Sequence, residues 1–230
     1  MTISDGPMQR LTIDIRELIA FCDEDDSARR NAKATKEIVG DELALPLLAR
    51  YFRERRRDAE VLPGLCTTGN TRGPQLRGWL QVKNPGGLML YQVQVKTWSR
   101  LSVRGRHLEL GATPAQIVRF KMQRWERYWD EEKGQFSDTE LNKVLLPMNP
   151  PFSGVPVEPR ACLWDAVHPK GGLEAFFSVE CASSHFQKVN IFSMSTFLRS
   201  KNVPTIQVEV PDDSKGLRWL ATEIPGWKLG

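Results

Sequence analysis

The sequence predicts an α/β (α+β) domain with a mixed central β-sheet flanked by helices. Two helical patterns, at 33–57 and 112–132, enclose a β-hairpin pattern at 75–96, and shorter strand and helix patterns follow. The chain has 230 residues, of which 40% are hydrophobic, so it can bury a sizeable core. We therefore expect a single domain over 1–230, in which the strands and helices of 157–221 extend the sheet.

Two helices are expected before the hairpin. Residues 11–22 are interpreted as a short first helix. The second, at 33–57, contains Pro46, which predicts a kink or a restart because a proline inside a helix costs about 3 kcal/mol. Four residues at helical spacing form its apolar face: Ile38, Leu45, Ala49 and Phe52.

The helix expected at 112–132 has a clear start. Thr113 is a suitable N-cap, and Pro114 suits the first helical position. Trp125 and Trp129 follow at helical spacing, which favours packing in the core over a platform for stacking bases.

Beyond the third helix, a proline-rich loop is expected at 145–160. We expect strands at 173–181 and 203–210, a strand that runs into a helix over 188–200, and a last short helix at 212–221.

The hairpin is defined by its turn. The tetrapeptide NPGG at 84–87 separates two alternating runs, 75–82 and 88–96. If Asn84 pairs with Gly87 across the turn, the register of the whole hairpin follows.

In this register, one face of the hairpin is polar. Arg77 lies opposite Gln94, with Cβ atoms about 5 Å apart. Lys96 shares this face because side chains alternate along a strand. The opposite face is apolar and should contact the core through Tyr91, Val93 and Val95.

Glu42 is a carboxylate on the apolar side of the helix at 33–57. A carboxylate is rarely buried without a partner, because loss of its hydration is costly. We therefore expect Glu42 to pair with Lys96 or to bind a metal.

A helix that carries Glu42, followed by a hairpin whose second strand ends in Gln94-x-Lys96, resembles the PD-(D/E)xK superfamily of restriction-endonuclease-like nucleases. The segment YQVQVKTWS is most similar to the QxK form of the Mrr-like branch. The resemblance covers about residues 34–100.

The resemblance implies a restriction-endonuclease-like core and metal-dependent hydrolysis of phosphodiester bonds in DNA, in a setting such as bacterial defence. Glu42 and Gln94 would then be ligands of Mg²⁺ or Mn²⁺, which stabilises charge on the phosphate and activates water. Lys96 would assist the nucleophilic water or the developing charge.

The chain departs from the family at Arg77, which stands where the family has an aspartate on the first hairpin strand. An arginine there would place a permanent positive charge where the metal belongs. The fold could persist without metal catalysis, with Arg77 paired to Glu42 or to a phosphate. Alternatively, a carboxylate from elsewhere completes the site, or position 77 itself carries an altered residue. The candidates for such a carboxylate are Glu60, Glu174 and Glu180.

The charge of the chain is compatible with nucleic-acid binding. The formal net charge is +4 at pH 7. Four arginines flank the hairpin and are expected to contact phosphates, which would give affinity with a strong salt dependence: Arg72, Arg100, Arg104 and Arg106.

Other classes receive little support from the sequence. No apolar run approaches the 18 to 20 or so residues of a membrane helix, and the first residues do not have a signal-peptide layout, so no membrane association and a cytoplasmic location are expected. The four cysteines lack the spacing of a zinc site.

Three hypotheses remain for the function. The first is a nuclease that acts on DNA, for which a homodimer is plausible because cutting both strands usually needs two sites. The second is a catalytically inactive nuclease-fold protein that binds nucleic acid. The third is a module whose hairpin and tryptophan-rich helix bind only another protein.

Overall fold

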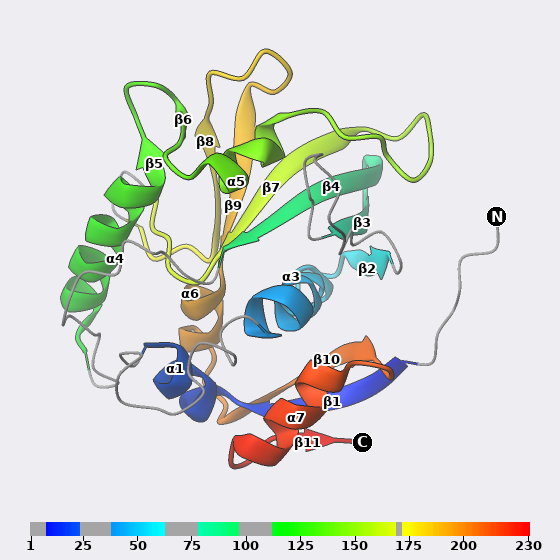
Figure 1. Cartoon of the computed structure of the whole chain (residues 1–230). Coiled ribbons are helices and arrows are strands. Elements are labelled where there is room, and N and C mark those ends of the chain that lie inside the picture. The colour runs from blue at the N-terminus through cyan, green and yellow to red at the C-terminus, as the bar shows by residue number, and fades with distance from the viewer. Residues whose placement is uncertain (1–7, 24–37, 63–77, 97–111, 169–171) are drawn as a thin grey trace.

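The computed structural model (Figure 1) describes residues 8–23, 38–62, 78–96, 112–168 and 172–230, which we refer to as the described residues. They form a mixed α and β structure with a large mixed sheet flanked by helices, so the predicted class is correct. Among these residues, no helix is long and apolar enough to span a membrane.

The larger sheet has six strands. Their spatial order is β2 (Asp58–Leu62), β3 (Gly78–Asn84), β4 (Gly87–Lys96), β7 (Val157–Leu163), β9 (Lys188–Ser193) and β8 (Phe176–Glu180). Strands β2, β3 and β4 are antiparallel, β4, β7 and β9 are parallel, and β8 is antiparallel to β9. From residue 157 onward, three strands extend this sheet: β7, β8 and β9.

A smaller sheet contains the two ends of the described chain. Its order is β10 (Thr205–Pro211), β1 (Met8–Asp14) and β11 (Lys228–Leu229). The helix expected at 11–22 is therefore wrong for its first residues, and α1 begins only at Ile15 (Ile15–Asp23). Leu11 and Ile13 alternate into the core, and seven residues of β1 pair with β10, which no local pattern could reveal.

Helix α3 (Ala44–Arg53) lies between the two sheets (Figure 1) and contacts β2, β3 and β10. It is buried on nearly every side because it has a sheet on each side. A π-helical turn, η1 (Val39–Leu43), precedes it, so Pro46 lies in the first turn of a restarted helix, as predicted. The helix ends at Arg53 rather than at residue 57.

Helix α4 (Pro114–Tyr128) packs on the other face of the larger sheet, where Trp125 and Tyr128 join a core cluster with residues of β7 and β9. Thr113 caps it in a capping box with Gln116, as its sequence predicts. The rings of Trp125 and Trp129 stack with their centroids 5.8 Å apart, and both side chains are buried, which confirms their role in packing.

The helix α4 ends four residues earlier than predicted. Trp129 begins the two-residue strand β5 (Trp129–Asp130), which pairs with β6 (Gln135–Phe136). The remaining helices are α5 (Thr139–Asn142), the 3-10 turn η2 (Lys143–Leu145), α6 (Met194–Arg199) and α7 (Lys215–Glu223). The expected strand–helix unit at 188–200 is confirmed by β9 and α6.

Candidate functional site

The carboxyl ends of β4, β7 and β9 meet at one edge of the larger sheet, because these strands are parallel. The Trp164 N–H donates to the Lys96 carbonyl (3.3 Å), and the Ser195 N–H donates to the Trp164 carbonyl (2.9 Å). Side chains just past such strand ends are well placed to bind ligands. We call the polar residues at this edge the strand-end site: Gln94, Lys96, Lys121, Arg124, Asp138, Asp165, Ser193, Ser195 and Thr196.

The hairpin register is as predicted up to the first described residue. Asn84 pairs with Gly87, and Gly78 pairs with Val93. Arg77, the predicted partner of Gln94, lies outside the described residues. The predicted core face of β4 is confirmed, because Tyr91, Val93 and Val95 are buried in the cluster around α3.

The four arginines expected to contact phosphates also lie outside the described residues: Arg72, Arg100, Arg104 and Arg106.

The polar face of β4 is mostly buried rather than open to solvent. Gln92 is fully buried and donates to the carbonyls of Val144 (2.5 Å) and Leu146 (2.8 Å), while its side-chain carbonyl accepts from the Met148 N–H (3.3 Å). These bonds hold the segment after α5 on the sheet.

Gln94 continues this pattern one step closer to the strand end. Its Nε2 donates to the carbonyl of Glu140 (3.3 Å), and its Oε1 is buried with no hydrogen-bond partner in the described part of the chain. The side chain is thus held by α5 and keeps one free acceptor.

Lys96 pairs with Asp138, with 2.7 Å between Nζ and Oδ2, and the two side chains are 28% and 32% exposed. Asp138 also caps α5, since its Oδ1 accepts from the N–H groups of Glu140 (3.0 Å) and Leu141 (2.9 Å). Burial would raise the pKa of Asp138, but Lys96 and these N–H groups hold it below its ordinary value. Sequence reasoning missed Asp138, although an aspartate just before a short helical pattern is a recognisable N-cap.

Glu42 is not brought to Lys96. Its Oε2 accepts from the hydroxyl of Ser214 and from the N–H of Leu217 (3.4 Å), at the start of α7. Gly216 permits this close approach, since a Cβ there would come 2.9 Å from the Glu42 Cδ. Glu42 therefore stabilises the amino terminus of α7, where negative charge is favourable.

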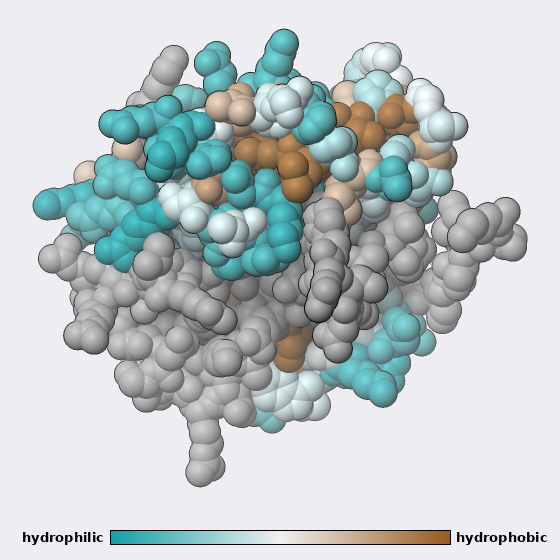
Figure 2. All heavy atoms as spheres, turned by 45° about the horizontal axis from the view of Figure 1, so that its top comes forward, coloured by the Kyte–Doolittle hydropathy of each residue, from teal (hydrophilic) through white to brown (hydrophobic). Residues whose placement is uncertain are grey.

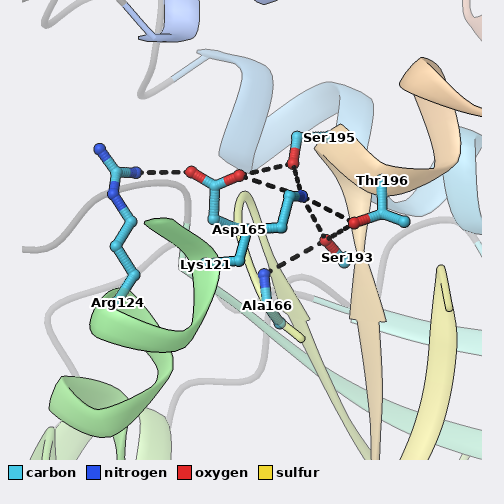
Figure 3. A network of polar contacts seen from close by, with 7 residues as sticks. All are labelled: Lys121, Arg124, Asp165, Ala166, Ser193, Ser195 and Thr196. Carbon is cyan, nitrogen blue, oxygen red and sulfur yellow. Dashed lines mark hydrogen bonds and ion pairs between the residues drawn. The ribbon is translucent and has the colours of Figure 1, made fainter. Parts of the chain in front are cut away.

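A second cluster, buried except for Arg124, connects α4 to the ends of β7 and β9 (Figure 3). The Lys121 Nζ lies 3.2 Å from Asp165 Oδ1 and donates to the hydroxyls of Ser195 (2.5 Å) and Thr196 (2.7 Å). Arg124 pairs with Asp165 through Nη1 and Oδ2 (2.7 Å). Ser195 donates its own proton to Asp165 Oδ1 (2.6 Å).

The sequence contains one signal for this cluster. Lys121 lies on the same helical stripe as Trp125 and Tyr128, which are buried. A charged residue on a buried stripe needs a partner, by the same reasoning that singled out Glu42. The partner itself, Asp165, could not be identified from spacing.

The charges of this cluster argue against an activated serine nucleophile. Burial would raise the pKa of Asp165, but Lys121 and Arg124 hold it below its ordinary value, so the carboxylate is ionised. The Ser195 hydroxyl donates to Asp165, and a carboxylate stabilised by two cations is a weak base for activating that hydroxyl. The cluster instead joins three elements of the fold through a satisfied buried charge.

The described residues do not fit a Mg²⁺ or Mn²⁺ site. They contain no group of three or more His, Cys, Asp or Glu side chains that could hold a metal. Glu42 is committed to α7, and Asp138 is committed to Lys96 and to the cap of α5. Gln94 alone offers a free oxygen, and one neutral oxygen is a poor site for a hard divalent cation.

The carboxylates suggested as replacements lie elsewhere. Glu60, on β2, lies opposite Gln81 of β3. Glu180, on β8, lies opposite Lys188 at the amino end of β9. Burial raises the pKa of Tyr51 on α3, and the negative charge of Glu174 adds a smaller contribution, so Glu174 lies toward the α3 side of the sheet.

No family model, curated protein or solved structure matches the chain. The resemblance to nucleases therefore depends on the hairpin residues and on the order of the elements, without support from a related protein.

Proposed function

We propose that this protein binds DNA at the strand-end site of a restriction-endonuclease-like core. The order of elements supports the proposal: helix α3, the antiparallel strands β2, β3 and β4, helix α4, and then β7 parallel to β4. The resemblance implies a helix followed by a hairpin whose second strand ends in Lys96, and Lys96 is the last residue of β4. A setting in bacterial genome defence or DNA processing follows from the resemblance alone.

The geometry favours binding over cleavage. The two proposed metal ligands, Glu42 and Gln94, make their contacts with different elements, α7 and α5. Lys96 forms an ion pair with Asp138 in place of a metal-bound water. Without a metal, the strand-end site can still place positive charge near the phosphates of DNA. Such charge increases the affinity for DNA but does not hydrolyse it.

The test is a pair of assays on the intact chain. DNA binding is measured by fluorescence anisotropy over a salt series, and plasmid nicking is measured with Mg²⁺ and with Mn²⁺. We expect salt-sensitive binding and no nicking. Lys133→Ala is the control, because Lys133 is an exposed lysine in the turn between β5 and β6. Nicking that is lost in Lys96→Ala but kept in Lys133→Ala would show an active nuclease and overturn the inactive form of the proposal.

A further variant tests the resemblance itself. If Arg77 replaces a metal-binding aspartate, Arg77→Asp should restore some nicking with Mn²⁺ or Mg²⁺. An inert Arg77→Asp protein that still binds DNA would support a binding role without a latent metal site. The molecular mass in solution, with and without DNA, tests the predicted homodimer.

A protein-binding module is the second candidate, because apolar side chains are exposed near the amino end of β7, at the opposite end of this strand from the strand-end site. Leu146 is 47% exposed, and Met148, Phe152 and Val155, which pack against Leu62, Trp79 and Leu90, are only partly buried. Figure 2 shows hydrophobic side chains gathered on the face that includes the top of Figure 1. If the chain binds no DNA at low salt and cleaves none, this candidate replaces the first.

A further inference from the structure

Arg124 is held in one position on α4. Its Nη1 pairs with Asp165 Oδ2 at 2.7 Å, and its guanidinium carbon lies 4.7 Å from the centre of the Phe120 ring. The side chain is nevertheless 24% exposed, whereas Asp165 is 2% exposed. Arg124 is thus the part of the buried cluster that reaches the surface, with its orientation set from two sides.

The guanidinium keeps most of its donors. An arginine has five N–H donors, and the Asp165 bond is the one hydrogen bond that Arg124 makes within the described residues. Figure 3 shows its second Nη pointing away from Asp165. A planar guanidinium with a free edge matches the oxygens of a phosphate, which it can bind through two parallel hydrogen bonds.

The charge around Arg124 also favours an anion. Asp165 is shared between two cations, Lys121 and Arg124, so its single negative charge does not belong to Arg124 alone. Lys121 has no exposed surface, and an anion from solvent would therefore meet Arg124.

The opposite side of α4 would repel a phosphate. Glu126 is two residues from Arg124, about 200° around the helix. It lines a hollow of about 490 Å³ together with three further carboxylates, Asp130, Glu131 and Glu132. A polyanion is therefore directed to the side of the helix that carries Arg124.

We propose that Arg124 is a phosphate-binding residue and that Asp165 is the positioning residue that aims it. This inference rests on the proposed DNA binding and names the residue that contacts the backbone at the strand-end site. The ligand is a phosphodiester group, recognised by charge and by the planar fork and not by base sequence.

The first experiment measures anisotropy of a labelled DNA duplex with the intact protein and with Arg124→Gln, Arg124→Lys and Arg119→Gln. Arg119 is an exposed arginine of the same helix and serves as the matched control. We expect Arg124→Gln to weaken binding on the order of tenfold, as for loss of one charged hydrogen-bonding group. The slope of log affinity against log salt should fall by about 0.9 in magnitude.

The other two variants separate charge from geometry. Arg124→Lys keeps the charge without the fork, so it should retain the salt slope but bind more weakly than the native protein. Arg119→Gln should behave as the native protein. If the native chain binds DNA and Arg124→Gln binds with unchanged affinity and slope, the inference is overturned while the proposed function stands.

A second experiment does not depend on DNA. The Arg124 Nε–H resonance, assigned by its absence in Arg124→Lys, is followed while inorganic phosphate is added to the native protein. A saturable shift supports the phosphate site even if the chain binds no DNA, in which case only the proposed function fails. An Arg124 resonance that phosphate leaves unchanged overturns the inference, whatever the DNA result.

Discussion

Replacing Asp165 by asparagine would remove the carboxylate that two cations share in the interior of the protein. Lys121 and Asp165 are fully or almost fully buried, and the contacts of Asp165 with Lys121, Arg124 and the Ser195 hydroxyl range from 2.6 to 3.2 Å. Asparagine has nearly the same shape but carries no charge, so the packing is kept and the ion pairs are lost.

The expected cost is large because a buried ammonium would lose its counter-charge. Removal of one partner from a buried pair typically destabilises a protein by about 3–5 kcal/mol. For a domain of this size, each kcal/mol lowers the melting temperature by about 2–4 °C, so the variant should melt about 6–20 °C below the native protein.

The assay is chemical unfolding followed by tryptophan fluorescence, with Asp130→Asn as the control. Asp130 pairs with Lys133 on the surface, where water and salt screen a single ion pair and leave it little effect on stability. A double variant, Lys121→Met with Asp165→Asn, should recover part of the loss, because it removes the unpaired charge. A loss below about 1 kcal/mol in Asp165→Asn, equal to that of the control, would refute the buried ion pair.

Three further outcomes are expected from the same unfolding assay. Arg160→Met should change the free energy of unfolding little. The guanidinium of Arg160 is buried without a hydrogen bond of good geometry to any described residue, and burial lowers its pKa to about 10, but it lies 3.5 Å from the centre of the Tyr91 ring, which offsets part of the cost of its burial. A loss above about 3 kcal/mol would contradict this. Glu42→Ala should lower the free energy of unfolding by about 1–2 kcal/mol, because the amino terminus of α7 loses its acceptor, and should leave DNA binding unchanged. A loss of DNA binding with native stability would instead show that Glu42 acts at the strand-end site. The pKa of Asp138 is lower in the folded than in the unfolded protein, so Asp138 contributes to stability above the ordinary aspartate pKa. This contribution is lost as the pH falls through the folded-state pKa. Lys96→Met should weaken this acid dependence, and an unchanged profile between pH 5 and 2 would speak against the pair.

Much of the fold was predictable because its signals are local. The turn at 84–87 determines the hairpin register, and the alternation of Tyr91, Val93 and Val95 identifies the core face. The start of α4 follows from Thr113 and Pro114, which act on their own neighbours. The strand at Met8–Asp14 was missed because a strand is stabilised by its pairing partner, here β10, almost 200 residues along the chain.

The candidate site was only partly predictable, for the same reason. The sequence identified Gln94 and Lys96 as polar neighbours at the end of a strand. It could not reveal that α5 binds Gln94 and supplies Asp138 to Lys96.

By itself, the sequence determined the periodic features of this protein: the hairpin and its register, the start of α4, and the unusual charge at Glu42. The tertiary structure decided the partner of each charge, Ser214 for Glu42 and Asp165 for Lys121. Side-chain spacing along one element is set by backbone geometry, which sequence patterns record. A contact between elements depends on how they pack, and that packing brings a lysine of α4 against residues that lie more than 40 positions further along the chain.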